Sequence, residues 1–81
     1  MNKALVELIA QFAVFLELAD ESEIPLETAV RQQEEMAFRM QKLSAEERTE
    51  FVRILHEVAE EEPFQAHREI LRRLPEDVGI Q

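Results

Sequence analysis

The sequence predicts an all-α fold, a small four-helix bundle with three long helices, a short fourth helix and a C-terminal tail. Apolar residues recur at helical spacing in four stretches of the chain. Pro25, a capping pattern at residues 44–47 and Pro63 separate these stretches, and one Gly leaves too few turns for an all-β domain. The 81 residues allow a single helical domain over 1–81, which must be well packed or borrow core from a partner.

The first helix is expected over residues 2–19. Steps of 100° per residue place one apolar face toward the expected core, made of Leu5, Leu8, Ile9, Phe12, Leu16 and Ala19. Apolar residues also interrupt the polar side, and a helix that is apolar nearly all round lies at the centre of a fold or at an interface. The sequence therefore predicts a possible dimer interface at Val14, Phe15 and Leu18.

The second helix is expected over residues 25–42, because Pro is tolerated in the first turn of a helix. Its expected buried stripe is Leu26, Ala29, Val30, Ala37 and Met40, with Met36 and Leu43 at the edges. Phe38 falls on the opposite side and is the one large aromatic residue that the wheel leaves exposed. It is either a boundary residue that packs on a neighbouring segment or an anchor for a partner, since aromatic residues carry much binding energy.

The third helix is expected over residues 45–61. Ser44 and Glu47 match a capping box, in which two side chains satisfy free backbone N–H groups at a helix start. The expected core face is Phe51, Val52, Ile54, Leu55, Val58 and Ala59. The opposite face carries acidic residues, Glu46, Glu50, Glu57, Glu60 and Glu61.

Pro63 precedes the fourth helix, which is expected over residues 64–74 and closed by Pro75. Its apolar residues are Phe64, Ile70, Leu71 and Leu74. The tail that follows contains Val78 and Ile80 around the single Gly, so it is able to fold back onto the bundle.

The charge of the chain is −9, with nine Lys and Arg against eighteen Asp and Glu. This charge repels nucleic acid and anionic lipid, and its natural complement is a basic protein surface. Residues 44–62 alone carry −5, from seven Glu against two Arg. Glutamates near the C-terminus of a helix oppose the helix dipole, so the third helix presents either a solvated face or a binding face for a basic partner.

No pattern in the sequence predicts catalysis. Cys is absent, and no Ser, Thr or Lys lies in a setting that would activate it as a nucleophile. The Glu-x-x-His pattern of helical di-iron proteins fails at both histidines, because Arg53 precedes His56 and Phe64 precedes His67 at that spacing. We therefore expect no enzyme, no metal and no cofactor, although His56 and Glu60 have a spacing compatible with a site.

The ends of the chain favour a cytoplasmic protein. No secretory cleavage pattern follows Lys3, and the apolar run at residues 4–19 contains Glu7, Gln11 and Glu17. That run also falls short of the roughly 20 apolar residues that cross a bilayer.

The chain resembles small, acidic, all-helical bacterial immunity proteins in size, charge and helix number. The resemblance is carried by acidic residues, Asp20 to Glu23, Glu34, Glu35, Glu46, Glu50, Glu57, Glu60 and Glu61. It implies a non-enzymatic inhibitor that neutralises a basic, nuclease-like toxin by direct binding. The colicin-type family carries a Tyr-Tyr contact pair, which this Tyr-free chain lacks, so no functional residue is carried over. The alternatives are a homodimer paired through the first helix and a DNA mimic that occupies a nucleic-acid-binding protein.

Overall fold

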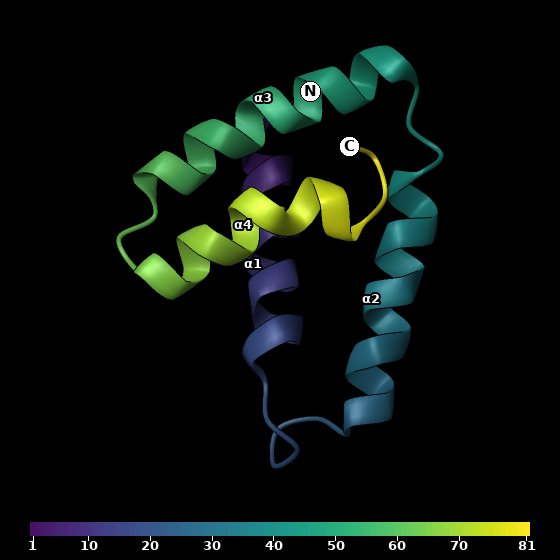
Figure 1. Ribbon diagram of the computed structural model, residues 1–81, viewed down its shortest axis with the longest axis vertical. Coiled ribbons are helices and arrows are strands. Elements are labelled where there is room, and N and C mark those ends of the chain that lie inside the picture. Colours follow the sequence, from purple (N-terminus) through teal and green to yellow (C-terminus); the bar gives the residue numbers. More distant parts are fainter.

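The computed structural model describes residues 1–81 as four helices without strands. They are α1 (Lys3–Leu18), α2 (Leu26–Met40), α3 (Ala45–Glu61) and α4 (Gln65–Asp77). The all-α prediction is therefore confirmed, and so is the bundle arrangement. Figure 1 shows α1 and α2 as one helical hairpin, and α3 with α4 as a second hairpin that crosses it.

The molecule is thin in one direction. Its principal extents are 37 × 29 × 19 Å. Because a helix with its side chains is about 10 Å across, the shortest extent accommodates two helix layers. No third layer covers the outer sides, so each helix has a face turned to solvent.

The buried side of α1 differs from the predicted one. The residues of α1 that are buried are Val6, Ala10, Ala13 and Leu16. Leu5, Leu8 and Phe12, which the sequence places in the core, are exposed. Leu16 is buried and Ile9 packs against the core, as predicted. The prediction was wrong for the other three because the wheel favours the face with the larger apolar residues. Here α1 contacts α2, α3 and α4, and its small residues face these neighbours.

The buried stripe of α2 is narrower than predicted. Ala29 and Met40 are buried, and partly buried Met36 and Ala37 pack against the core. Leu26 and Val30 are exposed, contrary to the prediction. The reason is that α2 makes its main helix contact with α1 alone, so one narrow side of α2 is covered.

The start of α3 has the predicted capping box. The backbone N–H of Glu47 donates to Ser44 Oγ at 3.1 Å, and the N–H of Ser44 donates to Glu47 Oε1 at 2.8 Å. Phe51 and Leu55 are fully buried at the centre of the core. The bounds predicted for α3 therefore agree with the structure.

Two arginines close the ends of α3 by donating to backbone carbonyl groups. Arg48 donates to the carbonyl oxygens of Leu43 and Gln41, which tightens the connection before α3. Arg68 on α4 donates through Nη1 to Glu62 O at 2.8 Å and to Pro63 O at 2.9 Å. Each arginine therefore holds a turn in place through hydrogen bonds from its guanidinium group to the backbone.

The helix α4 continues through Pro75, so the prediction of a short helix closed by this residue was wrong. It has 13 residues, and Pro75 is buried inside it. A proline ring fits the helical φ and removes one hydrogen bond, while the N–H of Val78 still donates to Leu74 O at 3.0 Å. The tail does fold back, because Val78 is buried and Ile80 packs against the core.

Candidate interaction surfaces

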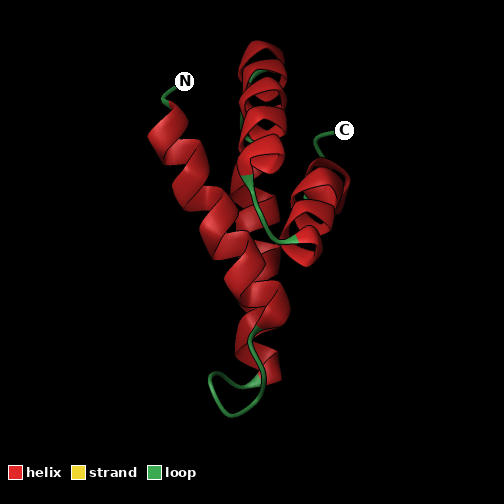
Figure 2. Ribbon diagram, turned by 90° about the vertical axis from the view of Figure 1, so that its left-hand side faces the viewer, coloured by secondary structure: helices red, strands yellow, loops and turns green.

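A continuous apolar face runs along the outer side of α1. We call it the α1 stripe, and it consists of Leu5, Leu8, Phe12, Phe15 and Leu18. These residues are between 41% and 62% exposed. They follow one another at steps of three, four, three and three, the spacing that keeps side chains on one side of a helix. Figure 2 shows α1 at the left edge of the molecule, with no other element outside it.

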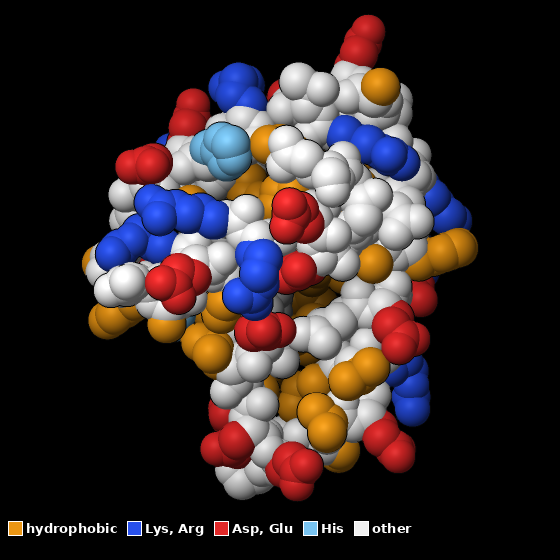
Figure 3. All heavy atoms as spheres, viewed as in Figure 1, with side chains coloured by type: hydrophobic (Ala, Val, Ile, Leu, Met, Phe, Trp, Pro, Cys, Tyr) orange, Lys and Arg blue, Asp and Glu red, His pale blue; other side chains and the backbone are white.

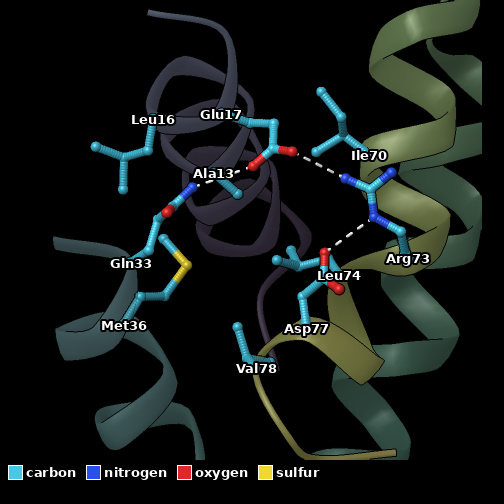
Figure 4. Close-up of a pocket in the computed structure, with 10 residues that line it drawn as sticks. All are labelled: Ala13, Leu16, Glu17, Gln33, Met36, Ile70, Arg73, Leu74, Asp77 and Val78. Atoms are coloured by element: carbon cyan, nitrogen blue, oxygen red, sulfur yellow. Dashed lines mark hydrogen bonds and ion pairs between the residues drawn. The ribbon is translucent and has the colours of Figure 1, made fainter. Parts of the chain in front are cut away.

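Two polar residues at the ends of α1 turn toward neighbouring helices. Lys3 forms a hydrogen-bonded ion pair with Glu61 on α3, and this hydrogen bond raises the pKa of Lys3. Glu17 accepts hydrogen bonds from Arg73 on α4 at 3.0 Å and from Gln33 on α2 at 3.1 Å (Figure 4). Both side chains therefore leave the stripe free of their charge.

The remaining polar residues of α1, Glu7 and Gln11, are exposed and lie beside α3 and α4. Glu7 and Gln11 line a shallow hollow together with Val58 on α3 and Leu71 on α4. Val14, predicted as part of a dimer interface, lines the same hollow and packs against the core. The outer face of α1 consequently has no charged residue within the stripe.

The sequence anticipated part of this surface. Phe15 and Leu18 lie in the α1 stripe, as the predicted interface requires. Leu5, Leu8 and Phe12 were missed as surface residues because they were assigned to the core. Their spacing was visible in the sequence, but a helix with two apolar faces does not reveal which face is buried.

The acidic residues predicted to bind a partner lie on α3 and are largely paired within the chain. Glu50 pairs with the N-terminal amino group, and Glu61 pairs with Lys3. Glu57 lies 3.9 Å from Lys3 and 3.5 Å from Arg53. Glu60 lies 3.8 Å from Arg72, whereas Glu46 is exposed and forms no ion pair within the chain. Exposed pairs of this kind contribute little to stability, so these carboxylates can exchange partners.

Most basic side chains of the chain contact another group of the same chain. Eight of the nine basic side chains have an internal partner, and Arg31 is the exception. Acidic side chains gather at the end of the molecule where the connection between α1 and α2 lies (Figure 3). The charge that remains for external contacts is therefore negative.

Phe38 is exposed, as predicted, with 57% of the residue accessible. It lies on α2, and the ammonium group of Lys42 sits 4.5 Å from the centre of its ring. This cation–π contact occupies one face of the ring. Phe38 and the acidic residues of α3 thus belong to different helices, and the structure does not join them into one patch by any contact.

A hollow with polar and apolar walls lies between α1, α2 and α4 (Figure 4). It has a volume of about 400 Å³ and apolar walls that include Leu16, Met36 and Ile70. At its rim, Arg73 is held between Glu17 and Asp77, with 3.2 Å from its Nε to Asp77. Because one guanidinium offsets only one of the two carboxylate charges, the rim keeps an excess of negative charge and offers no free cation for an anionic ligand.

Each of the two histidines lies beside one glutamate. His67 is half-buried, 3.6 Å from a carboxylate oxygen of Glu62, and its ring lies 5.2 Å from that of Phe64. His56 lies beside Glu60 at a small surface hollow. No three His, Asp or Glu side chains lie close enough together to hold a metal ion.

Comparisons with known proteins do not indicate a function, so the surfaces of the chain are the basis for inferring one. None of the helices has the length and the apolar character needed to cross a membrane. No protein-family model, curated protein or solved structure matches this chain.

Proposed function

We propose that this chain is a non-enzymatic protein-interaction module that binds another polypeptide through the α1 stripe. The observation that supports this function is the exposure of five large apolar residues in one row along α1, while two of the four buried residues of this helix are alanines. Monomeric proteins rarely expose a contiguous apolar patch of more than a few hundred Å², and larger patches mark interaction sites.

The size of the patch is sufficient to drive binding. Complete burial of a Leu or Phe side chain is worth about 1.5–3 kcal/mol, so each half-exposed residue of the stripe contributes roughly 1 kcal/mol when covered. Phe12 and Phe15 lie in its middle and have the largest rings. Aromatic residues near the centre of an interface carry much of its binding energy.

The shape of the patch favours a helical partner. Anchors spaced three and four residues apart along a helix fit the groove of another helix or helix pair. The 16 residues of α1 extend over about 24 Å, which is long enough for such packing.

A photo-crosslinking experiment tests the proposal. Benzoylphenylalanine is placed at position 12, in the stripe, and in a separate variant at position 38, which replaces an equally aromatic exposed residue on α2. Irradiation in cells of the source organism is expected to give a discrete adduct from position 12, identified by mass spectrometry. The adduct is expected to disappear when Leu8→Glu is added to the same chain. Equal adducts from both positions, or none from position 12, would contradict the function.

A second candidate function is the capture of a basic protein, such as a nuclease-like toxin, by acidic residues of α3. It is favoured by the net charge of −9 and by the ion pairs that five of the nine basic side chains form with carboxylates of the same chain. Complementary charge of this kind accelerates encounter with a basic surface. In a related possibility, the carboxylates mimic the phosphates of DNA and the partner is a nucleic-acid-binding protein. Nucleic acid would then compete with this chain for that partner.

Charge reversal tests the second function. Glu50, Glu57 and Glu60 are changed to Lys in one variant, and Glu21, Glu23 and Glu27 are changed to Lys in the control. Both variants alter the net charge by the same amount. Only the α3 variant is expected to lose a basic partner recovered by pull-down at 0.15 M salt. If both variants retain the partner equally, the acidic face of α3 does not bind it, and the second function is contradicted.

A further inference from the structure

We infer that the α1 stripe pairs with the α1 stripe of a second copy of this chain, with the two helices antiparallel about a two-fold axis near Phe12. This inference rests on the proposed function and names the partner. The argument uses the order of residues in the stripe, the area that it offers and the charges at its two ends.

The order of residues in the stripe is suited to antiparallel pairing. Its midpoint lies at residues 11 and 12, and Leu flanks the aromatic residues at both ends. A two-fold axis at this midpoint sets Leu5 opposite Leu18 of the second copy and Leu8 opposite Phe15. It brings Phe12 of both copies to the axis. A surface that is complementary to itself in this way forms a closed dimer.

The area of the stripe meets the requirement for a dimer. An aromatic side chain buries about 150–250 Å² when it is fully enclosed, so a half-exposed side chain offers roughly 100 Å². Five residues on each of two copies then give about 1,000 Å², the area above which a contact is large enough for a biological interface.

The charges at the two ends of α1 select the antiparallel orientation. The N-terminal end carries the amino group of Met1 and Lys3, whereas the other end is followed by Asp20, Glu21 and Glu23. None of these three carboxylates has an ion-pair partner in its own chain. The amino group of Met1 and Lys3 already pair with Glu50 and Glu61 of α3, so the unpaired charge is that of the three carboxylates. Antiparallel pairing keeps these carboxylates of the two copies at opposite ends of the interface. Parallel pairing would gather the carboxylates of both copies at one end, and it would also align the two helix dipoles unfavourably.

The same charges disfavour other occupants. A membrane-surface helix carries Lys and Arg beside its apolar face, whereas α1 has one Lys and two Glu. A basic protein would find no carboxylate within the stripe itself. A second copy matches the uncharged centre of the stripe and keeps the carboxylates that follow each α1 apart.

Sedimentation equilibrium tests the pairing with the complete chain. The wild type is expected to have a mass of 2 × 9.5 = 19 kDa at about 100 μM. Phe12→Glu places two carboxylates together at the axis and is expected to weaken pairing by at least about 100-fold. The matched control is Phe38→Glu, which makes the same change at an exposed residue on α2 and is expected to remain dimeric. Circular dichroism checks that both variants keep the helix content of the wild type.

The absence of Cys permits a direct test of orientation. Ala4→Cys and Ala19→Cys are prepared as separate variants, mixed in equal amounts and oxidised. In the antiparallel dimer position 4 of one copy lies near position 19 of the other, so the mixed disulfide is expected to dominate. Predominance of the 4–4 disulfide would overturn the antiparallel arrangement.

The outcomes separate this inference from the proposed function. A monomeric wild type, or a dimer that Phe12→Glu leaves intact, would overturn pairing through α1. If the wild type is monomeric while position 12 still crosslinks to a different protein in cells, the proposed function stands and only the second copy is rejected. Binding of the monomer to neutral phosphatidylcholine vesicles with loss on Phe12→Glu would instead assign the stripe to lipid and reject both.

Discussion

The side-chain amide of Gln41, directly after α2, donates a hydrogen bond to the backbone carbonyl of Val78 at 3.0 Å. This contact joins two segments that lie 37 residues apart in the sequence. Val78 is buried, and Gly79 follows it with φ of 77°. The path of the C-terminal tail therefore depends on a side chain that follows α2, in the other helical hairpin.

Replacement of Gly79 tests this dependence. In Gly79→Ala the new Cβ would lie 2.7 Å from Gln41 Nε2, and a residue with a side chain rarely adopts this φ. We expect a loss of about 1–2 kcal/mol in the free energy of unfolding, measured with urea by circular dichroism at 222 nm. In a Gln41→Ala background the loss is expected to be smaller, because the obstructing amide is gone. An unchanged loss in that background would show that the amide does not matter.

The capping box of α3 makes stability depend on pH in a defined direction. The Ser44 N–H, with its hydroxyl, lowers the pKa of Glu47 from its ordinary value of 4.5. A lowered folded-state pKa stabilises the fold above the unfolded pKa, and this contribution is lost as the pH falls through the folded one. Glu47→Gln is expected to be less stable than the wild type at pH 7, with the difference shrinking below pH 4.5.

Ser44→Ala provides the companion measurement for the same cap. It is expected to lower the free energy of unfolding by about 1 kcal/mol at pH 7, the usual effect of losing an N-cap side chain. A difference between Glu47→Gln and the wild type that stays constant from pH 7 to pH 3 would contradict the role of the ionised carboxylate.

Arg68 is expected to contribute to stability through backbone hydrogen bonds. Arg68→Met keeps much of the aliphatic length but removes the donors to Glu62 O and Pro63 O. Hydrogen bonds from charged groups contribute about 1.5–3 kcal/mol when buried, so this partly buried residue is expected to contribute about 1 kcal/mol in urea unfolding. Arg31→Met is the control, since Arg31 has no partner, and its effect is expected within about 0.5 kcal/mol. Equal effects at both positions would remove the special role of Arg68.

Truncation of a side chain is expected to change the free energy of unfolding much more on the buried side of α1 than on the exposed side. In a monomeric Phe12→Glu background, Leu16→Ala is expected to lower the free energy of unfolding by about 2–5 kcal/mol, because Leu16 is buried. Leu8→Ala, on the stripe, is expected to change it by less than about 0.5 kcal/mol. Urea unfolding of both variants compares them directly. Similar losses for the two variants would contradict the burial of the Leu16 side and the exposure of the Leu8 side of α1.

Salt is expected to distinguish self-pairing from capture of a basic protein. Two copies that each carry −9 repel at long range, and the Debye length falls from about 30 Å at 0.01 M salt to about 10 Å at 0.1 M. Raising the salt across this range is therefore expected to strengthen the dimer, measured by sedimentation. Binding of a basic partner through α3 is expected to weaken over the same range. A dimer that weakens as salt rises would contradict an apolar interface.

Much of the secondary structure could be predicted because the signals are local. Ser44 and Glu47 identify the start of α3, and Pro63 identifies its end, each through a few neighbouring backbone groups. The end of α4 could not be predicted in this way, because Pro75 continues the helix with a buried ring. Whether a proline ends a helix depends on what surrounds its ring, and that is a tertiary property.

The exposed apolar surface of α1 was predictable only in part. Phe15 and Leu18 were expected at an interface, but Leu5 and Phe12 were assigned to the core. Val14 was expected at the interface, and it packs against the core. Both faces of α1 are apolar, so helical periodicity identifies two candidate faces without choosing between them. The side that contains Ala10 and Ala13 is buried because α3 and α4 pack against it.

Composition and periodicity were enough to predict that the chain forms four helices and carries an acidic excess. These properties follow from composition and from interactions within a few residues. Only the tertiary structure decided which side of α1 is buried and which positive charges are neutralised internally. Packing and ion pairing join residues far apart in the chain, as Glu17 and Arg73 do, so their outcome requires the positions of all four helices.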